Sequence, residues 1–190
     1  MDNGIKSRLG KKDILTIPNM LSFFRILLIP LMAVLYCRFE AYAAAVVVIA
    51  ISGITDILDG KIARKYNMVS DFGKFLDPLA DKLTQAAMVL CLAVRYPWMM
   101  VLFVLMLVKE SVLMVCAYGA FKATNTVNSA KWYGKVTTVT LYTVMILLFL
   151  MPDIPVRLAE AGILLCGCVI VMSMILYVQF FIKILMEQKV

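Results

Sequence analysis

The chain has 190 residues, of which 63% are hydrophobic, and its formal net charge is +7. A soluble globular domain is much less apolar, so this composition excludes an ordinary soluble enzyme or a soluble nucleic-acid-binding module. It predicts an all-α integral membrane protein.

Residues 1–16 are too polar for a signal peptide and contain no cleavage site. We expect them to lie on the cytoplasmic membrane surface as a short amphipathic juxtamembrane segment. Pro18 marks the start of the first membrane span, since the first N–H groups of a helix lack partners in any case. The chain is therefore divided into a cytoplasmic segment at 1–16 and one six-helix domain at 17–190.

Six hydrophobic segments follow, each with about the 17–25 residues that a transmembrane helix needs. They are expected at residues 17–36, 41–64, 72–94, 97–120, 134–151 and 157–182. These segments predict a six-transmembrane-helix bundle.

The basic residues predict the orientation of the bundle. Thirteen Lys and Arg lie in the terminal segments and in the connections after the second and fourth spans. The other connections hold three, which are Arg38, Arg95 and Arg157. Because basic residues stay on the cytoplasmic side, both termini are expected in the cytoplasm. We interpret most of these residues as topology signals and as partners of anionic lipids, not as a nucleic-acid surface.

Two of the predicted spans carry four aspartates. Asp56 and Asp59 are spaced i, i+3, and Asp77 and Asp81 are spaced i, i+4, so each pair shares one helix face. An aspartate at the centre of a membrane helix costs roughly 2.5–3.5 kcal/mol on insertion scales, which makes a function the default interpretation. Two facing helices would bring the four carboxylates into one small space.

Such a cluster would repel itself unless a cation neutralised it. The ligands would all be oxygen atoms, with no His or Cys nearby, which favours Mg²⁺ or Mn²⁺. The alternative is that the aspartates form structural ion pairs with the basic residues around them, Lys61, Arg64, Lys74 and Lys82.

The residues that follow Asp59 suit a phosphate-bearing ligand. Gly60 and Ala63 have almost no side chain, so a ligand could approach the backbone closely, although small residues also serve helix packing. Arg64 has a forked guanidinium that suits phosphate or pyrophosphate. Asp56 lies roughly 12 Å inside the second span by the helical rise. The predicted site therefore opens toward the cytoplasm.

The stretch from Asp56 to Asp81 resembles the signature D-x(2)-D-G-x(2)-A-R-x(8)-G-x(3)-D-x(3)-D of the CDP-alcohol phosphatidyltransferase family, at all eight fixed positions. The resemblance implies six transmembrane helices, usually in a homodimer, and transfer of a phosphatidyl group from CDP-diacylglycerol to an alcohol with release of CMP. It implies two bound divalent ions, with Asp56, Asp59 and Asp77 as ligands. Asp81 would be the general base, a metal ligand or both. The CDP site would be lined by Asp56, Gly60, Ala63, Arg64 and Gly73.

Residues 72–82 resemble the form of the signature found in phosphatidylglycerophosphate synthases, whose acceptor is glycerol 3-phosphate. Ile17-Pro18-Asn19 and Trp132-x-Gly134-Lys135 are similar to that branch too. Two positions depart from it, since Thr137 replaces a basic residue and Lys109-Glu110 stands near the place of an Arg-Glu pair. Cardiolipin synthases share the string Asp-Pro-Leu-Ala-Asp-Lys, so phosphatidylglycerol is the alternative acceptor.

Four cations are candidates for binding the acceptor. Lys135, at the cytoplasmic start of the fifth span, is the best placed, whereas Lys131 could be only a topology anchor. Lys109 and Glu110 leave a helix about 100° apart and are not expected to face each other. Arg25, within the first span, either pairs with an acid or meets a headgroup.

A transporter or channel that uses intramembrane carboxylates is the rival from another class. Such sites lie near the membrane midplane between inverted repeats, whereas the aspartates here gather toward one end and no repeat is visible. The expected protein is therefore a metal-dependent enzyme of a bacterial-type cell membrane. Its expected partners are CDP-diacylglycerol, an alcohol acceptor, membrane lipids and a second copy of the chain.

Overall fold

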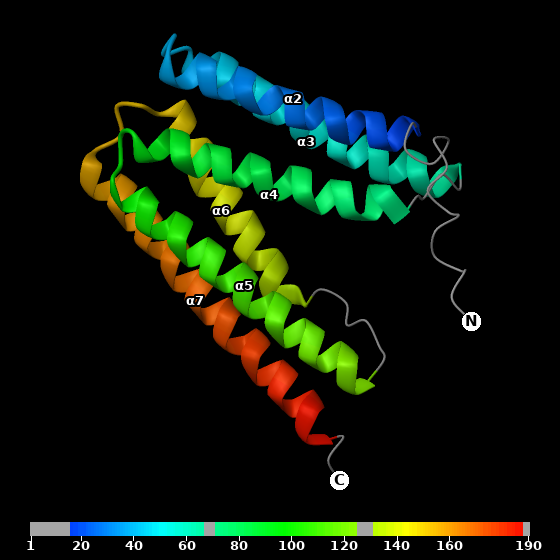
Figure 1. The fold of residues 1–190 in the computed structure, drawn as a ribbon. Helices are drawn as coiled ribbons and strands as arrows, with labels where there is room; N and C mark the ends of the chain where they lie inside the picture. Colours follow the sequence, from blue (N-terminus) through cyan, green and yellow to red (C-terminus); the bar gives the residue numbers. More distant parts are fainter. Residues whose placement is uncertain (1–15, 67–70, 125–130, 188–190) are drawn as a thin grey trace. The chain divides into compact units, whose positions relative to one another are not determined.

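The computed structural model describes residues 16–66, 71–124 and 131–187. Within these ranges every regular element is a helix (Figure 1). The six helices are α2 (Ile17–Cys37), α3 (Tyr42–Lys65), α4 (Asp71–Ala93), α5 (Trp98–Thr124), α6 (Trp132–Leu150) and α7 (Val156–Glu187). The prediction of an all-α fold with six helices is confirmed.

Five of these helices are long and apolar enough to cross a membrane, as expected of a multi-pass membrane protein. Among the described helices, α4 falls outside this set, and its first half carries the charged residues Asp71, Asp77 and Asp81. Large apolar side chains such as Leu27 and Met114 are exposed on the helix surfaces. The hydrocarbon of a bilayer would solvate such side chains as well as a protein core does.

The chain divides into two compact units, residues 1–91 and residues 92–190. The first contains α2, α3 and most of α4, and the second contains α5, α6 and α7. The prediction of one domain over residues 17–190 stays a prediction. The predicted juxtamembrane segment at 1–16 lies, apart from Thr16, outside the described residues.

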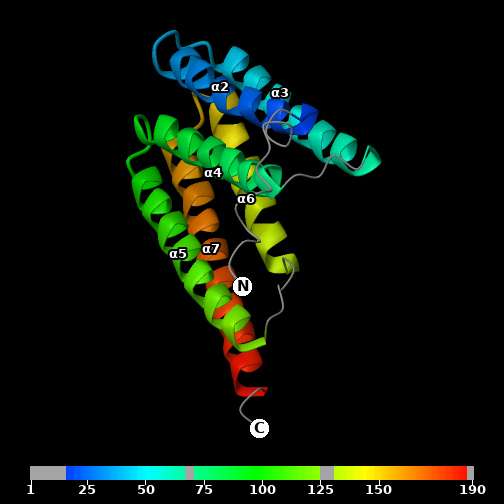
Figure 2. The ribbon, with the colours of Figure 1, turned by 45° about the vertical axis from the view of Figure 1, so that its right-hand side comes forward.

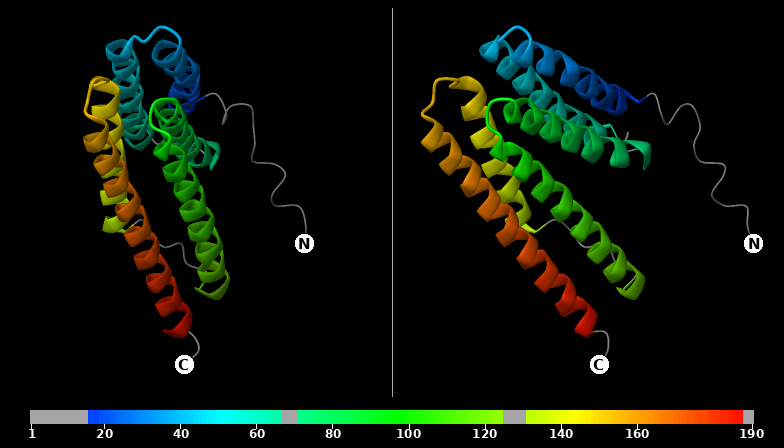
Figure 3. Two further views of the ribbon diagram at one scale, coloured as in Figure 1. Left: turned by 90° about the vertical axis from the view of Figure 1, so that its left-hand side faces the viewer. Right: turned by 60° about the vertical axis from the view of Figure 1, so that its left-hand side comes forward.

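In the first unit, α2 and α3 pack against each other as an antiparallel pair (Figure 3). Their short connection contains Glu40, whose φ of 52° lies in the left-handed region. The rings of Tyr36 and Tyr42 pack edge-on beside this connection, with 5.2 Å between centroids. The ring of Phe23 on α2 lies 6.2 Å from that of Phe72 on α4. Aromatic contacts thus link the three helices.

The buried residues of α2 recur every three or four positions, and those of α3 also share one helix face, so each set forms one stripe along its helix. Each stripe has an apolar part and a polar part. The stripes consist of Asn19, Ser22, Arg25, Leu28, Met32 and Tyr36 on α2, and of Ala45, Val48, Ile49, Ser52 and Asp59 on α3. Polar residues come first on α2 and last on α3. Because the helices are antiparallel, the two polar parts lie at the same end of the pair.

In the second unit, α7 packs against both α5 and α6. Figures 1 and 2 show α5 and α7 side by side along much of their length. A buried cluster joins the three helices through Ala120, Tyr133, Tyr177 and Phe181. The rings of Tyr133 and Tyr177 meet edge-on with 4.5 Å between centroids. A Cβ added at Gly134 would overlap the Tyr177 hydroxyl group, so glycine lets α6 approach α7 closely.

We expect Gly134→Ala to lower the free energy of unfolding by about 1–3 kcal/mol, the usual cost of inserting a methyl group into a packed core. The Tyr177 ring cannot move away easily because it is buried. Gly53→Ala on α3 is the control, since no heavy atom lies within 4 Å of an added Cβ there. Thermal unfolding of the purified protein in detergent measures both variants. Equal stability of the two would contradict the predicted overlap.

Candidate active site

Arg25 on α2 occupies the centre of the polar end of the first unit. Its Nη1 donates to Oδ1 of Asp56 at 2.5 Å and to Oδ1 of Asp81 at 2.8 Å. Its Nη2 donates to Oδ2 of Asp59 at 3.3 Å and lies 3.7 Å from Oδ1 of Asp77. The structure thus brings all four aspartates together around one guanidinium. Of the two alternatives for Arg25, the pairing with acids is the one observed.

Ser22 lies three residues before Arg25 on the same face of α2. Its Oγ donates to Oδ1 of Asp77 at 2.5 Å and lies 3.2 Å from the carbonyl oxygen of Pro18. The shorter contact is to a carboxylate, which is the stronger acceptor. Helix α2 therefore donates hydrogen bonds to carboxylates on both α3 and α4.

The carboxylates differ in their access to the surroundings. The side chain of Asp59 is 3% exposed and that of Arg25 is 2% exposed, so this pair forms the closed side of the cluster. The side chains of Asp56, Asp77 and Asp81 are 42%, 40% and 51% exposed. The cluster thus has one open side, where a ligand can reach three carboxylates.

The residues predicted to line a CDP site lie on α3 and α4. Gly60 is half-buried on α3 and Gly73 is buried on α4. Each lies within one helical turn of an aspartate of the cluster. The side chains of Ala63 and Arg64 lie outside the part of the chain that the structure describes.

The three candidate acceptor lysines belong to the second unit. Lys109 is buried on α5, and its Nζ contacts Oε1 of Glu110 at 3.3 Å. The expectation that these two side chains do not face each other is wrong, because both are long enough for their ends to meet. Lys131 precedes α6, with its Nζ 4.1 Å from the centroid of the Phe180 ring. Lys135 is exposed on the first turn of α6.

The carboxylate oxygens of the cluster and its negative charge both suit a hard divalent cation. Four carboxylates carry four negative charges, and Arg25 neutralises one of them. The contacts with Arg25 use one oxygen of each carboxylate, which leaves four oxygens of the type that Mg²⁺ and Mn²⁺ prefer. As placed, the carboxylates surround the guanidinium. In the described ranges no three acidic, His or Cys side chains converge on one metal-sized point.

Neither the contact of Ser22 with the cluster nor the central position of Arg25 was predicted from the sequence. A signal was present, because Asn19, Ser22 and Arg25 recur at three-residue spacing within an apolar segment. All three are buried in the structure. A polar stripe on a membrane helix indicates an interior polar neighbour, and here that neighbour is the acidic cluster.

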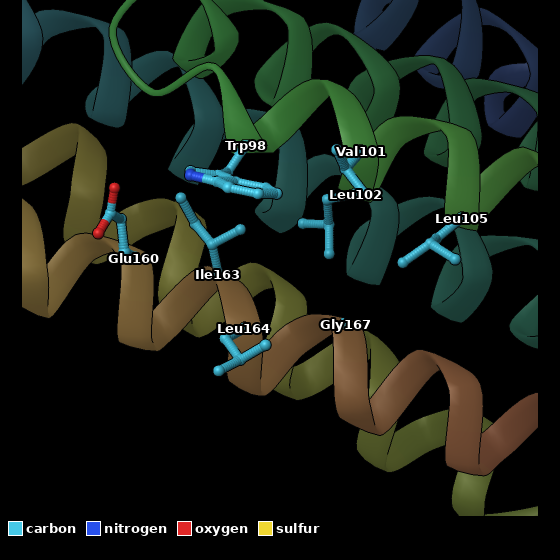
Figure 4. A pocket seen from close by; sticks show the side chains of 8 residues that line it. All are labelled: Trp98, Val101, Leu102, Leu105, Glu160, Ile163, Leu164 and Gly167. Carbon is cyan, nitrogen blue, oxygen red and sulfur yellow. The ribbon is translucent and has the colours of Figure 1, made fainter.

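A separate cavity of about 350 Å³ lies between α5 and α7 in the second unit (Figure 4). Leu102, Leu105, Ile163 and Leu164 contribute its apolar walls. The side chains of Trp98 and Glu160 lie together at one end. Such a lining suits hydrocarbon and offers no set of converging polar groups, so the acidic cluster is the better candidate for chemistry.

The fold and the cluster together define a multi-pass helical membrane protein with an acidic site contributed by three helices. Residues 15–185 match the family model of the CDP-alcohol phosphatidyltransferases. The chain belongs to this family. Its members are enzymes that act on CDP-alcohols, and they generally depend on a divalent metal ion.

Curated relatives carry the names of two enzymes. The CDP-diacylglycerol–glycerol-3-phosphate 3-phosphatidyltransferase of Salmonella choleraesuis is 31% identical over 86% of this chain and 93% of the relative. The cardiolipin synthase (CMP-forming) of Streptomyces coelicolor is 36% identical over 58% of this chain. A cardiolipin synthase/mitochondrial hydrolase fusion protein of Schizosaccharomyces pombe is 45% identical over 45% of this chain. The chain spans only 54% and 14% of the lengths of these last two proteins.

Because Asp59 is buried and Asp81 is half-exposed, we expect their substitution to affect the free energy of unfolding differently. Asp59→Asn should lower the free energy of unfolding by about 2 kcal/mol, because it removes a buried charge-assisted hydrogen bond to Arg25, which keeps its other carboxylate partners. Asp81→Asn should change it by less than about 1 kcal/mol, since a half-exposed pair contributes little. Thermal unfolding with a chelator present compares the two variants without bound metal. A larger loss in Asp81→Asn would contradict the closed and open sides described above.

Proposed function

We propose that the protein transfers the phosphatidyl group of CDP-diacylglycerol to glycerol 3-phosphate, forming phosphatidylglycerophosphate and CMP. The name of the Salmonella relative, which matches across 93% of its length, supports this acceptor. The observation that carries the proposal is the convergence of the four signature aspartates on one place with an open side. A transporter is disfavoured by membership in an enzyme family.

In this proposal a hydroxyl oxygen of the acceptor attacks the β-phosphorus of the donor. The bond from that phosphorus to the CMP oxygen breaks, and CMP leaves with the electron pair. Asp81 takes the hydroxyl proton as general base. Its carboxylate is the most exposed of the four, which suits a group that must meet an incoming acceptor.

The remaining signature residues would hold the donor. Asp56, Asp59 and Asp77, together with Asp81 where it is a ligand, would bind two Mg²⁺ or Mn²⁺ ions. When bound, such ions polarise the pyrophosphate and neutralise charge on the leaving group. Asp56 and Gly60, with Ala63, Arg64 and Gly73, would line the CDP site.

Among the acceptor candidates, Lys135 has the most accessible ammonium group, because it is exposed on the first turn of α6. Lys131 lies over the Phe180 ring and Lys109 is buried beside Glu110, so both would have to rearrange. Both Nη atoms of Arg25 already contact carboxylates, so Arg25 is the least suited to a free phosphate.

The proposed membrane orientation rests on the basic residues, and the proposed oligomeric state rests on the family resemblance. We infer from the distribution of Lys and Arg that both termini and the active site face the cytoplasm, and we propose a bacterial-type cell membrane as the location. We also propose a homodimer, which the family resemblance supports.

A cardiolipin synthase-type reaction, with phosphatidylglycerol as acceptor, is the second candidate. It is favoured by the higher identities of 36% and 45% to the two cardiolipin synthase relatives, although these cover shorter stretches.

An acceptor panel separates the two reactions. Purified protein with CDP-diacylglycerol and Mg²⁺ or Mn²⁺ should release CMP with glycerol 3-phosphate and not with phosphatidylglycerol, serine or inositol phosphate. Asp77→Asn should abolish release with every acceptor, because it weakens the proposed metal site, and its folded state is checked by gel filtration. CMP release only with phosphatidylglycerol would establish the second candidate. Normal turnover in Asp77→Asn would contradict the metal role.

Lys135→Ala should raise the KM for glycerol 3-phosphate about tenfold, the effect of losing about 1.4 kcal/mol of binding. The KM for CDP-diacylglycerol should change much less. Lys122→Ala is the matched control, since Lys122 is also exposed and lies on the same predicted side of the membrane. An unchanged acceptor KM in Lys135→Ala would remove this lysine from the site.

A further inference from the structure

Arg25 is the cation on which the arrangement of the acidic cluster depends. It lies 2% exposed on α2 and contacts carboxylates from α3 and from α4. The shortest contact on α3 is with Asp56 and the shortest on α4 is with Asp81. Its guanidinium therefore links three helices at one point.

The charge balance explains why a cation is needed there. Four carboxylates within contact distance of one centre repel each other, and the repulsion is stronger in a low-dielectric setting than in water. A guanidinium presents five N–H donors in a rigid plane and stays charged at any physiological pH. It can thus bind several carboxylates at fixed angles, which a lysine ammonium does less well.

We propose that Arg25 is a positioning residue that holds the four carboxylates in place as a preformed site in the metal-free protein. The divalent cations of the proposed function would then bind the remaining carboxylate oxygens while Arg25 keeps its contacts. The role of Arg25 in the metal-free protein stands independently of the proposed function. Only the response to added metal rests on that function.

Burial argues against the other role for Arg25, direct binding of a substrate phosphate. The side chain is 2% exposed, and its Nη atoms already contact all four carboxylates. A phosphate could reach it only by displacing carboxylates, and it would add negative charge to an already negative centre.

A double-mutant cycle with a chelator present tests the proposal. Arg25→Met should lower the Tm by at least about 5 °C, since it leaves the carboxylates without their cation. Arg38→Met, at an exposed arginine just after α2, is the matched control and should leave the Tm nearly unchanged. Arg25→Lys should lie between wild type and Arg25→Met, because it keeps the charge and loses the fork.

The second arm of the cycle distinguishes charge balance from packing. Asp56→Asn should lower or hardly change the Tm of the wild-type protein and should raise the Tm of Arg25→Met, since it then relieves repulsion. If Arg25→Met does not fold, Asp56→Asn should recover folded protein in that background. The same effect of Asp56→Asn in both backgrounds, or no recovery by any carboxylate-to-amide change, would overturn the proposal.

Added Mg²⁺ gives a further readout that does not involve activity. The rise in Tm on adding Mg²⁺ should be larger for Arg25→Met than for wild type, because the variant has no internal cation. An equal rise in both proteins would overturn the positioning role. Absence of any rise in both would count against the metal part of the proposed function, and the chelator experiments would then decide the role of Arg25 by themselves.

Discussion

The balance of negative charge inside an apolar helix bundle is the constraint on which the first unit depends. Four carboxylates on α3 and α4 must be neutralised, since an uncompensated acid at membrane depth is costly. Arg25 supplies one positive charge from a third helix. Three negative charges remain, so the open side of the cluster has an excess of negative charge. Under the proposed function, the Arg25 guanidinium therefore serves both the stability of the first unit and its metal site.

The pairing of α2 with α3 creates this arrangement from a simple pattern. Each helix buries one stripe, and the polar part of the stripe lies near the start of α2 and near the end of α3. Because the helices are antiparallel, Arg25 and Asp59 meet at the same end and Met32 and Ala45 lie toward the other. The apolar parts of the stripes hold the helices together, and this packing fixes the distance across which the ion pairs form.

The sequence predicted the six helices well, five of them from long apolar runs, and it placed the aspartates on shared faces because helical spacing is regular. The third predicted span is a helix, α4, but among the described helices it is the one not apolar enough to be counted as membrane-spanning. The prediction was less accurate at the C-terminal ends of α5 and α7, which extend to Thr124 and Glu187. Hydropathy falls there, but the helical backbone bonds continue. The sequence alone also could not choose the partner of Arg25, since spacing within α2 contains no information on which helix lies opposite.

The residues proposed to bind the donor are easier to predict than those proposed to bind the acceptor. The signature aspartates, Gly60 and Gly73 lie within residues 56–81, in one unit, where helical spacing constrains them. The acceptor candidates Lys109, Lys131 and Lys135 lie in the second unit and make three different local contacts. The chain is similar to relatives with both reaction names, so this similarity does not separate the acceptors. Under the proposed function, the choice between glycerol 3-phosphate and phosphatidylglycerol depends on side chains outside the acidic cluster, and Lys135 is the most accessible of the three candidate lysines.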